Sequence, residues 1–340
     1  CPGQSVTLGG VAFTAKGLVG VGRIPAAQRD TTGETFGSLS GLALDRATWR
    51  RSADGAAYAG TLHSLSDRGR VKNGVTTNYR PRIHQLSVAF TPAPAGSSTQ
   101  TQLRLSLTET RLLSETDGTP LTGFEGLSLS LDGRTIYALL QSALRQDGGE
   151  DGNSQRRHTR LLAYDIANPA APVLTGEWIL PLPVYTQSGS QQVASVGDMV
   201  AINGRQFLVL VRDGNGRGGD TPVSLYRAVL VYDVTGATNL AGSAFDNPNN
   251  PAAPRGVLAS SIVPASSAVL INLNDAAQLS RFGLNNGPSD NANTLSEKWE
   301  SLALVPALGA AAKGVECAAA QQFQRGEKPE APAHPGPEAL

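Results

Sequence analysis

The chain has 340 residues, which is enough to bury a large core in one all-β domain. Its 28 Lys and Arg residues balance 28 Asp and Glu residues, so the zero net charge argues against a nucleic-acid partner or an anionic membrane surface. Charged residues make up 16% of the chain, against about 25% in ordinary globular proteins. Because 38 Gly and 21 Pro residues also make it rich in turns, the composition favours many short strands over helices.

The cysteines predict the compartment. Cys1 and Cys317 are the only two, and a disulfide between them would tie the two ends of the chain together in an oxidising environment. The alternative is two unrelated free thiols. No apolar run approaches the ~20 residues of a membrane span. A chain that begins at Cys1 is what removal of a signal peptide would leave, so we expect a secreted, extracellular monomer without a membrane span.

In chain order, the first strand-rich unit spans residues 38–69, from SLSGLALD to AYAGTLHSLSDRG. The second, at 124–144, reads FEGLSLSLDGRTIYALLQSAL. Three leucines at 127, 129 and 131 alternate there with serines, which predicts a strand buried on one face. Asp132-Gly133 is a tight-turn signal, so this unit is predicted to be a hairpin. The third unit is VGDMVAINGRQFLVLVRDGN at 196–215, and the fourth is KWESLALV at 298–305, where no second strand follows.

Two further strands follow each of the three complete units, for example RIHQLSVAF and TQLRLSLTETRLL after the first. Four strands per repeated unit predict a β-propeller of four-stranded blades with four visible units. The strands VTLGGVAF and GLVGVGRI near the N-terminus are predicted to complete the last blade. Only 274–282 shows helical periodicity, and the polar loops at 145–159 and 245–256 are expected to be exposed and mobile.

The predicted domain division is a propeller at 1–308 and a low-complexity tail at 309–340. The tail is rich in Ala, Pro, Gly and Glu and shows no strand pattern.

Aligning the units predicts which side chains meet at the propeller axis. Ser40, Glu125, Gly197 and Glu300 share one column, and Asp198 lies one position further on. The ends of the second strands align Ser66, Gln141 and Arg212, and the next column holds Asp67, Ser142 and Asp213. The innermost strands of all blades face a common axis, so these positions are predicted to form one ring.

The ring is acidic, with arginines beside it. Its predicted metal ligands are Glu125, Asp198 and Glu300, and its predicted catalytic residues are Glu125, Asp67, Arg68, Arg212 and Asp213. Oxygen ligands without His or Cys suit Ca²⁺, which would neutralise the repelling carboxylates while arginine binds an ester. The alternative is structural: the same acids cap strand ends and hydrogen-bond to the backbone of neighbouring blades.

Four of these segments together resemble one family. FEGLSLSLDGRTIYALLQSAL, SLSDRG at 64–69, FLVLVRDGNG at 207–216 and EKWESLALVP at 297–306 resemble the phytase-like family, described as having esterase-like activity of phytase. The segment GGVAFTAKGLVGVGRIP resembles its fungal branch. The resemblance implies a secreted or periplasmic propeller that hydrolyses a small-molecule phosphate ester or another ester.

Two departures from the family pattern stand out. Relatives carry another acid-Glu-Gly hairpin before the FEGL segment, whereas here 120–123 runs directly into Phe124, which indicates that one blade is absent. Relatives also continue past EKWESLALVP into another strand, where this chain has its Ala-rich tail. A non-catalytic propeller that binds a ligand or partner is therefore the second hypothesis.

Two other chemical signals are weaker. Arg157-His158-Thr159-Arg160 resembles the RHGxR motif of histidine acid phosphatases, but threonine replaces the glycine and the segment is predicted to lie in a polar loop. The four histidines have no metal-ligand spacing, which argues against zinc.

Overall fold

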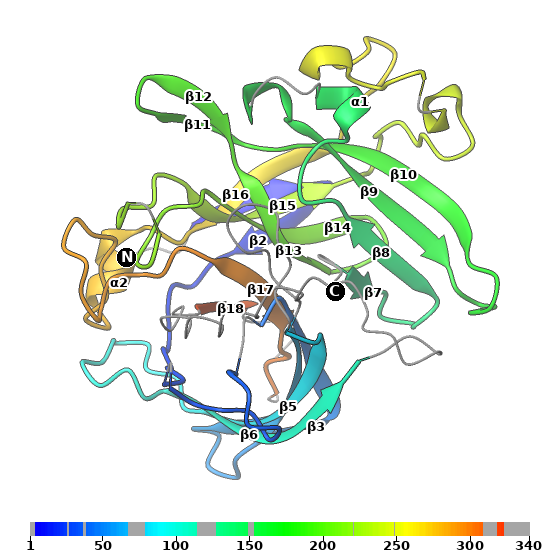
Figure 1. Cartoon of the computed structure of the whole chain (residues 1–340). Coiled ribbons are helices and arrows are strands. Elements are labelled where there is room, and N and C mark those ends of the chain that lie inside the picture. The colour runs from blue at the N-terminus through cyan, green and yellow to red at the C-terminus, as the bar shows by residue number, and fades with distance from the viewer. Residues whose placement is uncertain are drawn as a thin grey trace, which may run out of the picture.

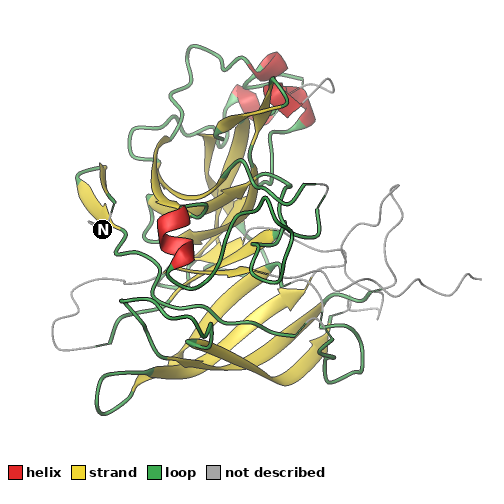
Figure 2. Ribbon diagram, turned by 90° about the vertical axis from the view of Figure 1, so that its left-hand side faces the viewer, coloured by secondary structure: helices red, strands yellow, loops and turns green. Residues whose placement is uncertain are grey.

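The chain is all-β. The computed structural model describes residues 4–25, 27–36, 39–66, 79–113, 127–148, 153–219, 221–247, 249–308 and 318–322. Nearly all of their regular structure is antiparallel strand, as Figures 1 and 2 show. Within these ranges no helix has both the length and the apolar character needed to cross a membrane.

Three sheets have four strands each, and in each sheet the strand order follows the chain. The first consists of β3 (Gly41–Arg51), β4 (Tyr58–Ser66), β5 (Arg82–Phe90) and β6 (Leu103–Leu112). The second consists of β7 (Leu127–Leu129), β8 (Thr135–Leu139), β9 (His158–Asp165) and β10 (Val173–Pro181). The third consists of β13 (Ser195–Ala201), β14 (Gln206–Arg212), β15 (Arg227–Asp233) and β16 (Ser266–Asn272). The prediction of two further strands after each complete unit is confirmed.

The fourth unit differs from the prediction at both of its ends. β17 (Trp299–Leu304) pairs with β18 (Ala318–Gln322), so the expectation of no strand in 309–340 is wrong at this point. The backbone N–H and C=O groups of β17 need hydrogen-bond partners, and the backbone of β18 supplies them. The alanines of β18 have a low strand propensity, so the sequence pattern did not indicate this strand. The prediction that VTLGGVAF and GLVGVGRI complete this unit is wrong, because the second segment, at 17–24, forms no strand. β1 (Ser5–Leu8) and β2 (Val11–Thr14) form a separate hairpin.

The N-terminal hairpin turns at two glycines with positive φ, Gly9 and Gly10, which is the backbone that a two-residue turn requires. It lies against β16, and the Gln4 side chain donates a 2.8 Å hydrogen bond to the Val269 carbonyl. A second small hairpin is formed by β11 (Val184–Gln187) and β12 (Ser190–Val193). Because β1 and β2 pair with each other, they do not pair with the edge of β17.

Short helices occupy the loops. α2 (Ala276–Ser280) begins after Asp275, whose carboxylate accepts from two backbone N–H groups, and it confirms the helix predicted within 274–282. α1 (Arg145–Gly148) and single 3₁₀ turns at 153–155, 244–246 and 254–256 lie in the two long polar loops.

The prediction that both polar loops are exposed is wrong in part, because Asp147 and the stretch 252–253 are buried. The Asp147 carboxylate accepts from the backbone N–H groups of Ala252 (2.7 Å) and Ala253 (3.1 Å). One acid in the first loop therefore holds the second loop against it.

The main core lies between the second and third sheets. Tyr137, Leu139 and Leu161 from the second sheet pack with Phe207 and Leu230 from the third. β17 lies between the third and first sheets and contacts both β13 and β3 (Figure 1). Strand ends from all three sheets are thereby brought towards β17.

The hairpin at 127–139 forms as predicted, but its burial is reversed. Leu127, Leu129 and Leu131 are 51%, 54% and 58% exposed. The inward residue is Ser128, whose Oγ accepts a 2.9 Å hydrogen bond from the backbone N–H of Ala201 at the end of β13. The expectation that the leucines form the buried face is therefore wrong, because the neighbouring sheet is held on the serine side.

Candidate functional site

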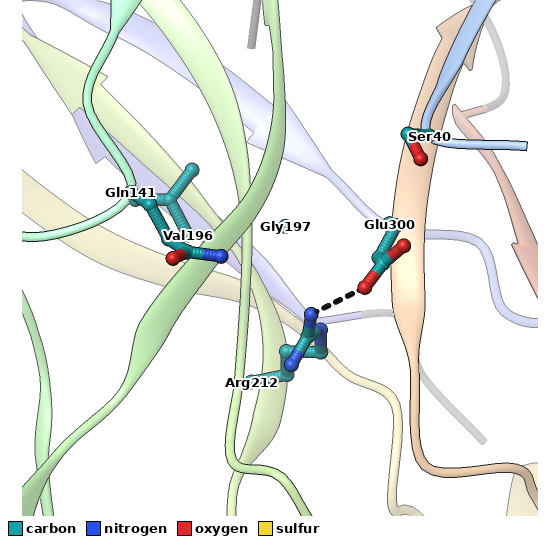
Figure 3. Close-up of a pocket in the computed structure, with 6 residues that line it drawn as sticks. All are labelled: Ser40, Gln141, Val196, Gly197, Arg212 and Glu300. Atoms are coloured by element: carbon teal, nitrogen blue, oxygen red, sulfur yellow. Dashed lines mark hydrogen bonds and ion pairs between the residues drawn. The ribbon is translucent and has the colours of Figure 1, made fainter. Parts of the chain in front are cut away.

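Equivalent positions of the repeat units meet at one pocket, shown in Figure 3. Its lining residues are Ser40, Gln141, Val196, Gly197, Arg212 and Glu300. Ser40 precedes β3, Gln141 follows β8, Arg212 ends β14 and Glu300 lies in β17, so all three large sheets contribute a strand end. The two aligned columns of the sequence supply five of the six lining residues.

An ion pair occupies the centre of the pocket. Arg212 Nη2 lies 2.8 Å from Glu300 Oε1, as the dashed line in Figure 3 marks. Arg212 also donates to two backbone carbonyls, from Nε to Trp299 at 2.9 Å and from Nη1 to Asp213 at 3.3 Å. The arginine side chain is 5% exposed and the glutamate 25%. The backbone therefore fixes the cation, while the carboxylate keeps contact with solvent.

Position 197 requires glycine for a steric reason. A Cβ atom built there would collide with the carbonyl oxygen of Trp299, and the ladder between β13 and β14 shifts register at this residue. β13 and β17 can approach this closely only because position 197 has no side chain. This approach brings the Trp299 carbonyl within reach of Arg212.

Ser40 and Gln141 complete the polar lining. The Ser40 backbone N–H donates to Leu65, whereas its Oγ is buried and has no hydrogen-bond partner among the described residues. The Gln141 carbonyl accepts from the backbone N–H of Val196 at 3.1 Å. Both residues lie in the aligned columns, but they carry no charge, so a prediction based on charged residues does not include them. Their column position was the signal that could have identified them.

Asp198 does not line the pocket. It is 4% exposed, and its carboxylate accepts from the backbone N–H groups of Met199 and Leu302, both at 2.7 Å. Burial raises the pKa of Asp198 to about 8, although both hydrogen bonds act in the opposite direction. This carboxyl links β13 to β17, as the structural alternative for the acids describes.

Asp213 is likewise used within the protein. Its carboxylate accepts five hydrogen bonds, from the backbone N–H groups of Asn215, Leu225 and Tyr226 and from the side chains of Asn215 and Ser224. The residue is 3% exposed. These contacts hold the two ends of the loop between β14 and β15 together.

The other predicted site residues, Asp67, Arg68 and Glu125, lie outside the described residues, as do Cys1 and Cys317. Of the predicted acids, Glu300 lies in the pocket with Arg212. The carboxylates of Asp198 and Asp213 instead accept hydrogen bonds within the fold. Within the described part of the chain, no three His, Cys, Asp or Glu side chains gather in a way that could hold a metal ion.

The segment 157–160 is not a polar loop, because residues 158–160 begin β9. Arg160 is 3% exposed and forms ion pairs with Asp147 (2.8 Å) and Glu177 (2.5 Å). Its charge is satisfied by two buried acids, which explains why a charged segment can start a buried strand.

Two comparisons with known proteins bear on this pocket. The family model described as "Phytase-like: Esterase-like activity of phytase" matches residues 121–315, which include five of the six lining residues and the Arg212–Glu300 pair. A protein of Arthroderma benhamiae, named an uncharacterized secreted protein, is 26% identical over 430 residues, covering 88% of this chain and 83% of the relative. Because that matched region is longer than the whole 340-residue chain, the relative carries segments that this chain lacks.

Proposed function

The chain belongs to the phytase-like family, and from that premise we propose that it is a secreted hydrolase of phosphate esters or other esters, with its active site at the Arg212–Glu300 pocket. Secretion is in keeping with the name of the Arthroderma benhamiae relative. The observation that supports the site most strongly is the meeting of strand ends from three sheets around one fixed arginine and one partly exposed carboxylate.

Arg212 suits the binding of an anionic ester. Its guanidinium is already oriented by two backbone carbonyls, so little side-chain entropy is lost when it binds an oxyanion. It pairs with Glu300 through a single nitrogen, Nη2. A phosphate or carboxylate that shares this nitrogen with Glu300 would place the ester beside the carboxylate.

Glu300 is the proposed general base. Its side chain is 25% exposed, so water reaches it, and an ester held by Arg212 would lie within one water molecule of its oxygens. In that role Glu300 takes the proton from the attacking water, and the Ser40 hydroxyl and the Gln141 amide are available to donate to the developing oxyanion.

Calcium assistance and closure of the sheets into a propeller are further parts of the proposal. The described acids supply little for calcium, because the Asp198 oxygens accept from backbone N–H groups and Glu300 pairs with Arg212. No catalytic step is therefore assigned to the ion. The propeller is supported by the repeated four-strand units and by the position of β17 between two of the sheets.

The test is turnover of phytate, p-nitrophenyl phosphate and p-nitrophenyl acetate by the full chain, with calcium and with EDTA. The variant Glu300→Gln keeps the shape of the side chain and its acceptor oxygen for Arg212, and should lower kcat by about 100-fold or more. Glu109→Gln is the matched control, since Glu109 pairs with Arg111 on an exposed part of β6.

If Glu300→Gln loses turnover while the control Glu109→Gln keeps it, the result supports an active site at the Arg212–Glu300 pocket. Equal turnover in wild type and Glu300→Gln would move the active site elsewhere. Absence of turnover by wild type with every substrate, in both calcium and EDTA, would favour the second candidate, a propeller that binds without catalysis. That candidate is supported by Asp198 and Asp213, whose oxygens are already used by the fold.

A further inference from the structure

A serine hydroxyl without a partner lines the pocket. Ser40 is 5% exposed, and its Oγ is buried and has no hydrogen-bond partner among the described residues. It shares the pocket with Arg212 and Glu300, and in Figure 3 its hydroxyl points towards the Glu300 carboxylate. An unpaired buried hydroxyl destabilises a fold, so stability alone does not explain a serine at this position.

The backbone holds Ser40 beside the strand that carries Glu300. The Ser40 N–H donates to the Leu65 carbonyl at 2.7 Å. The carbonyl of the preceding residue, Leu39, accepts a 2.9 Å hydrogen bond from the Ser301 hydroxyl, and Ser301 follows Glu300 in β17. Direct neighbours of Ser40 and Glu300 are therefore bonded to each other, which orients the two side chains in the pocket before any substrate binds.

Glu300 has one oxygen available for a proton. Arg212 pairs with Oε1, and no donor among the described residues contacts Oε2. A carboxylate beside a serine can take the hydroxyl proton and make the oxygen a nucleophile. The Ser40 hydroxyl does not hydrogen-bond to Glu300 in this structure, and catalytic contacts of this kind can be long in the free enzyme and tighten in the complex with substrate.

The charge of the pocket selects among esters. Its described lining has one cation, Arg212, and one anion, Glu300, which already pair with each other. A phosphate monoester dianion would gain one shared cation and would lie against a carboxylate that repels it. A neutral carboxylic ester brings no charge, and its oxyanion develops beside Arg212 and the Gln141 amide only in the transition state. The lining therefore favours the neutral ester.

We propose that Ser40 is the nucleophile of the pocket, that the substrate is an uncharged carboxylic ester, and that the reaction passes through an acyl-Ser40 intermediate. Ser40 Oγ attacks the acyl carbon while its proton passes to Glu300. When the tetrahedral intermediate collapses, the bond from the acyl carbon to the alcohol oxygen breaks, and the alcohol leaves with the proton held by Glu300. The products of this step are the alcohol and acyl-Ser40.

Water completes the cycle. A water molecule attacks the acyl carbon and gives its proton to Glu300, the bond to Ser40 Oγ breaks, and the proton returns to Ser40. The sum is ester plus water giving acid plus alcohol, and Glu300 is the general base in both steps. The covalent step rests on the proposed hydrolase and adds its nucleophile and its substrate class.

The first test is acetylation of the full chain by p-nitrophenyl acetate. After an acid quench, we expect intact mass to show one acetyl group and peptide mapping to place it on Ser40. Ser40→Ala should lose this label and lower kcat by about 10³-fold or more. Ser64→Ala is the matched control, because Ser64 is a buried serine of β4 whose hydroxyl also has no partner among the described residues, and it does not line the pocket. Acetylation elsewhere with Ser40 unlabelled overturns the assignment.

The second test does not depend on how much acyl-Ser40 accumulates or on whether Ser40→Ala folds. Hydroxylamine competes with water for a common intermediate, so the ratio of hydroxamate to acetate should be the same for p-nitrophenyl acetate and phenyl acetate. A ratio that differs between the two esters, or wild-type kcat in Ser40→Ala, shows direct attack by water. That result overturns the nucleophile and leaves the proposed hydrolase standing. Absence of turnover of every ester by wild type contradicts both.

Two further measurements separate the base and the substrate class. Glu300→Gln should slow the acetylation of Ser40 by about 100-fold, and an unchanged rate would remove Glu300 as the base. We expect no turnover of p-nitrophenyl phosphate above the buffer rate. Turnover of this phosphate ester that is lost in Glu300→Gln would overturn the assignment of an uncharged substrate.

Discussion

Asp198 offers a sharp test of whether its carboxyl is structural. It is 4% exposed, and burial raises its pKa from 3.8 to about 8. Between these two values the folded chain holds a proton that the unfolded chain releases. Stability is therefore fully present below about pH 4, decreases as the pH rises through this window, and becomes level above about pH 8.

The size of the effect follows from the shift. One pKa unit corresponds to about 1.36 kcal/mol, so raising the pH from 5 to 8 should lower the free energy of unfolding by about 4 kcal/mol through Asp198 alone. Asp198→Asn removes this dependence. It also replaces one of the two oxygens that accept from Met199 and Leu302 by an NH₂ group, which leaves a buried N–H unpaired at a cost of about 1–3 kcal/mol.

The stability curves of wild type and Asp198→Asn should therefore cross. Wild type is expected to be more stable at pH 5, and the variant as stable or more stable at pH 8, in urea unfolding measured by fluorescence at several pH values. Asp165→Asn, at the end of β9, is the control, because Asp165 is exposed and should leave the shape of the curve unchanged. Parallel curves for wild type and Asp198→Asn would refute the reasoning, and calcium-dependent stabilisation of wild type alone would return Asp198 to the metal hypothesis.

Two further predictions concern stability. Asp147→Ala removes one of the two acids that pair with Arg160 and the acceptor of two backbone N–H groups, and it should cost about 3–5 kcal/mol in urea unfolding. Arg111→Ala breaks an exposed pair and should have no measurable effect. Leu129→Thr should change the free energy of unfolding little because Leu129 is 54% exposed, and a large loss would show that its face is covered in solution. Leu161→Ala, in the core, should lose about 2–5 kcal/mol.

The strand pattern of the sequence was sufficient to predict the sheets and the meeting of strand ends. Each complete unit has the same order of strand, turn and strand, so equal positions in the units occupy equal places in the fold. This is why Ser40, Gly197 and Glu300 line one pocket although the sequence separates them widely. The aligned second-strand ends brought Gln141 and Arg212 to the same place.

The orientation of each face could not be predicted in the same way. The alternation at 127–131 shows that leucines and serines lie on opposite faces, but not which face has a neighbour. Here Ser128 accepts from Ala201 and the leucines are exposed. The partner of β17 was unpredictable for a related reason, since the alanines of β18 carry no strand signal.

Asp198 shows that the position of a residue in a repeat unit does not by itself determine its role. It follows Gly197 directly, but the β13–β14 ladder shifts register between Val196 and Asp198. The Asp198 carboxylate accepts from the backbone N–H groups of Met199 and Leu302 and does not line the pocket.

Arg212 and Arg227 show that two neighbouring residues of the same type can have different roles. They are opposite each other on neighbouring strands, with the same charge and similar burial. Arg212 reaches Glu300 and therefore belongs to the pocket. Among the described residues, Arg227 donates to two carbonyls and lies near the Trp299 ring. Their roles depend on which acceptor lies within hydrogen-bond distance, and that depends on how closely β17 approaches β13. Glycine at position 197 permits that approach, so a residue without a side chain allows the Trp299 carbonyl to accept from Arg212.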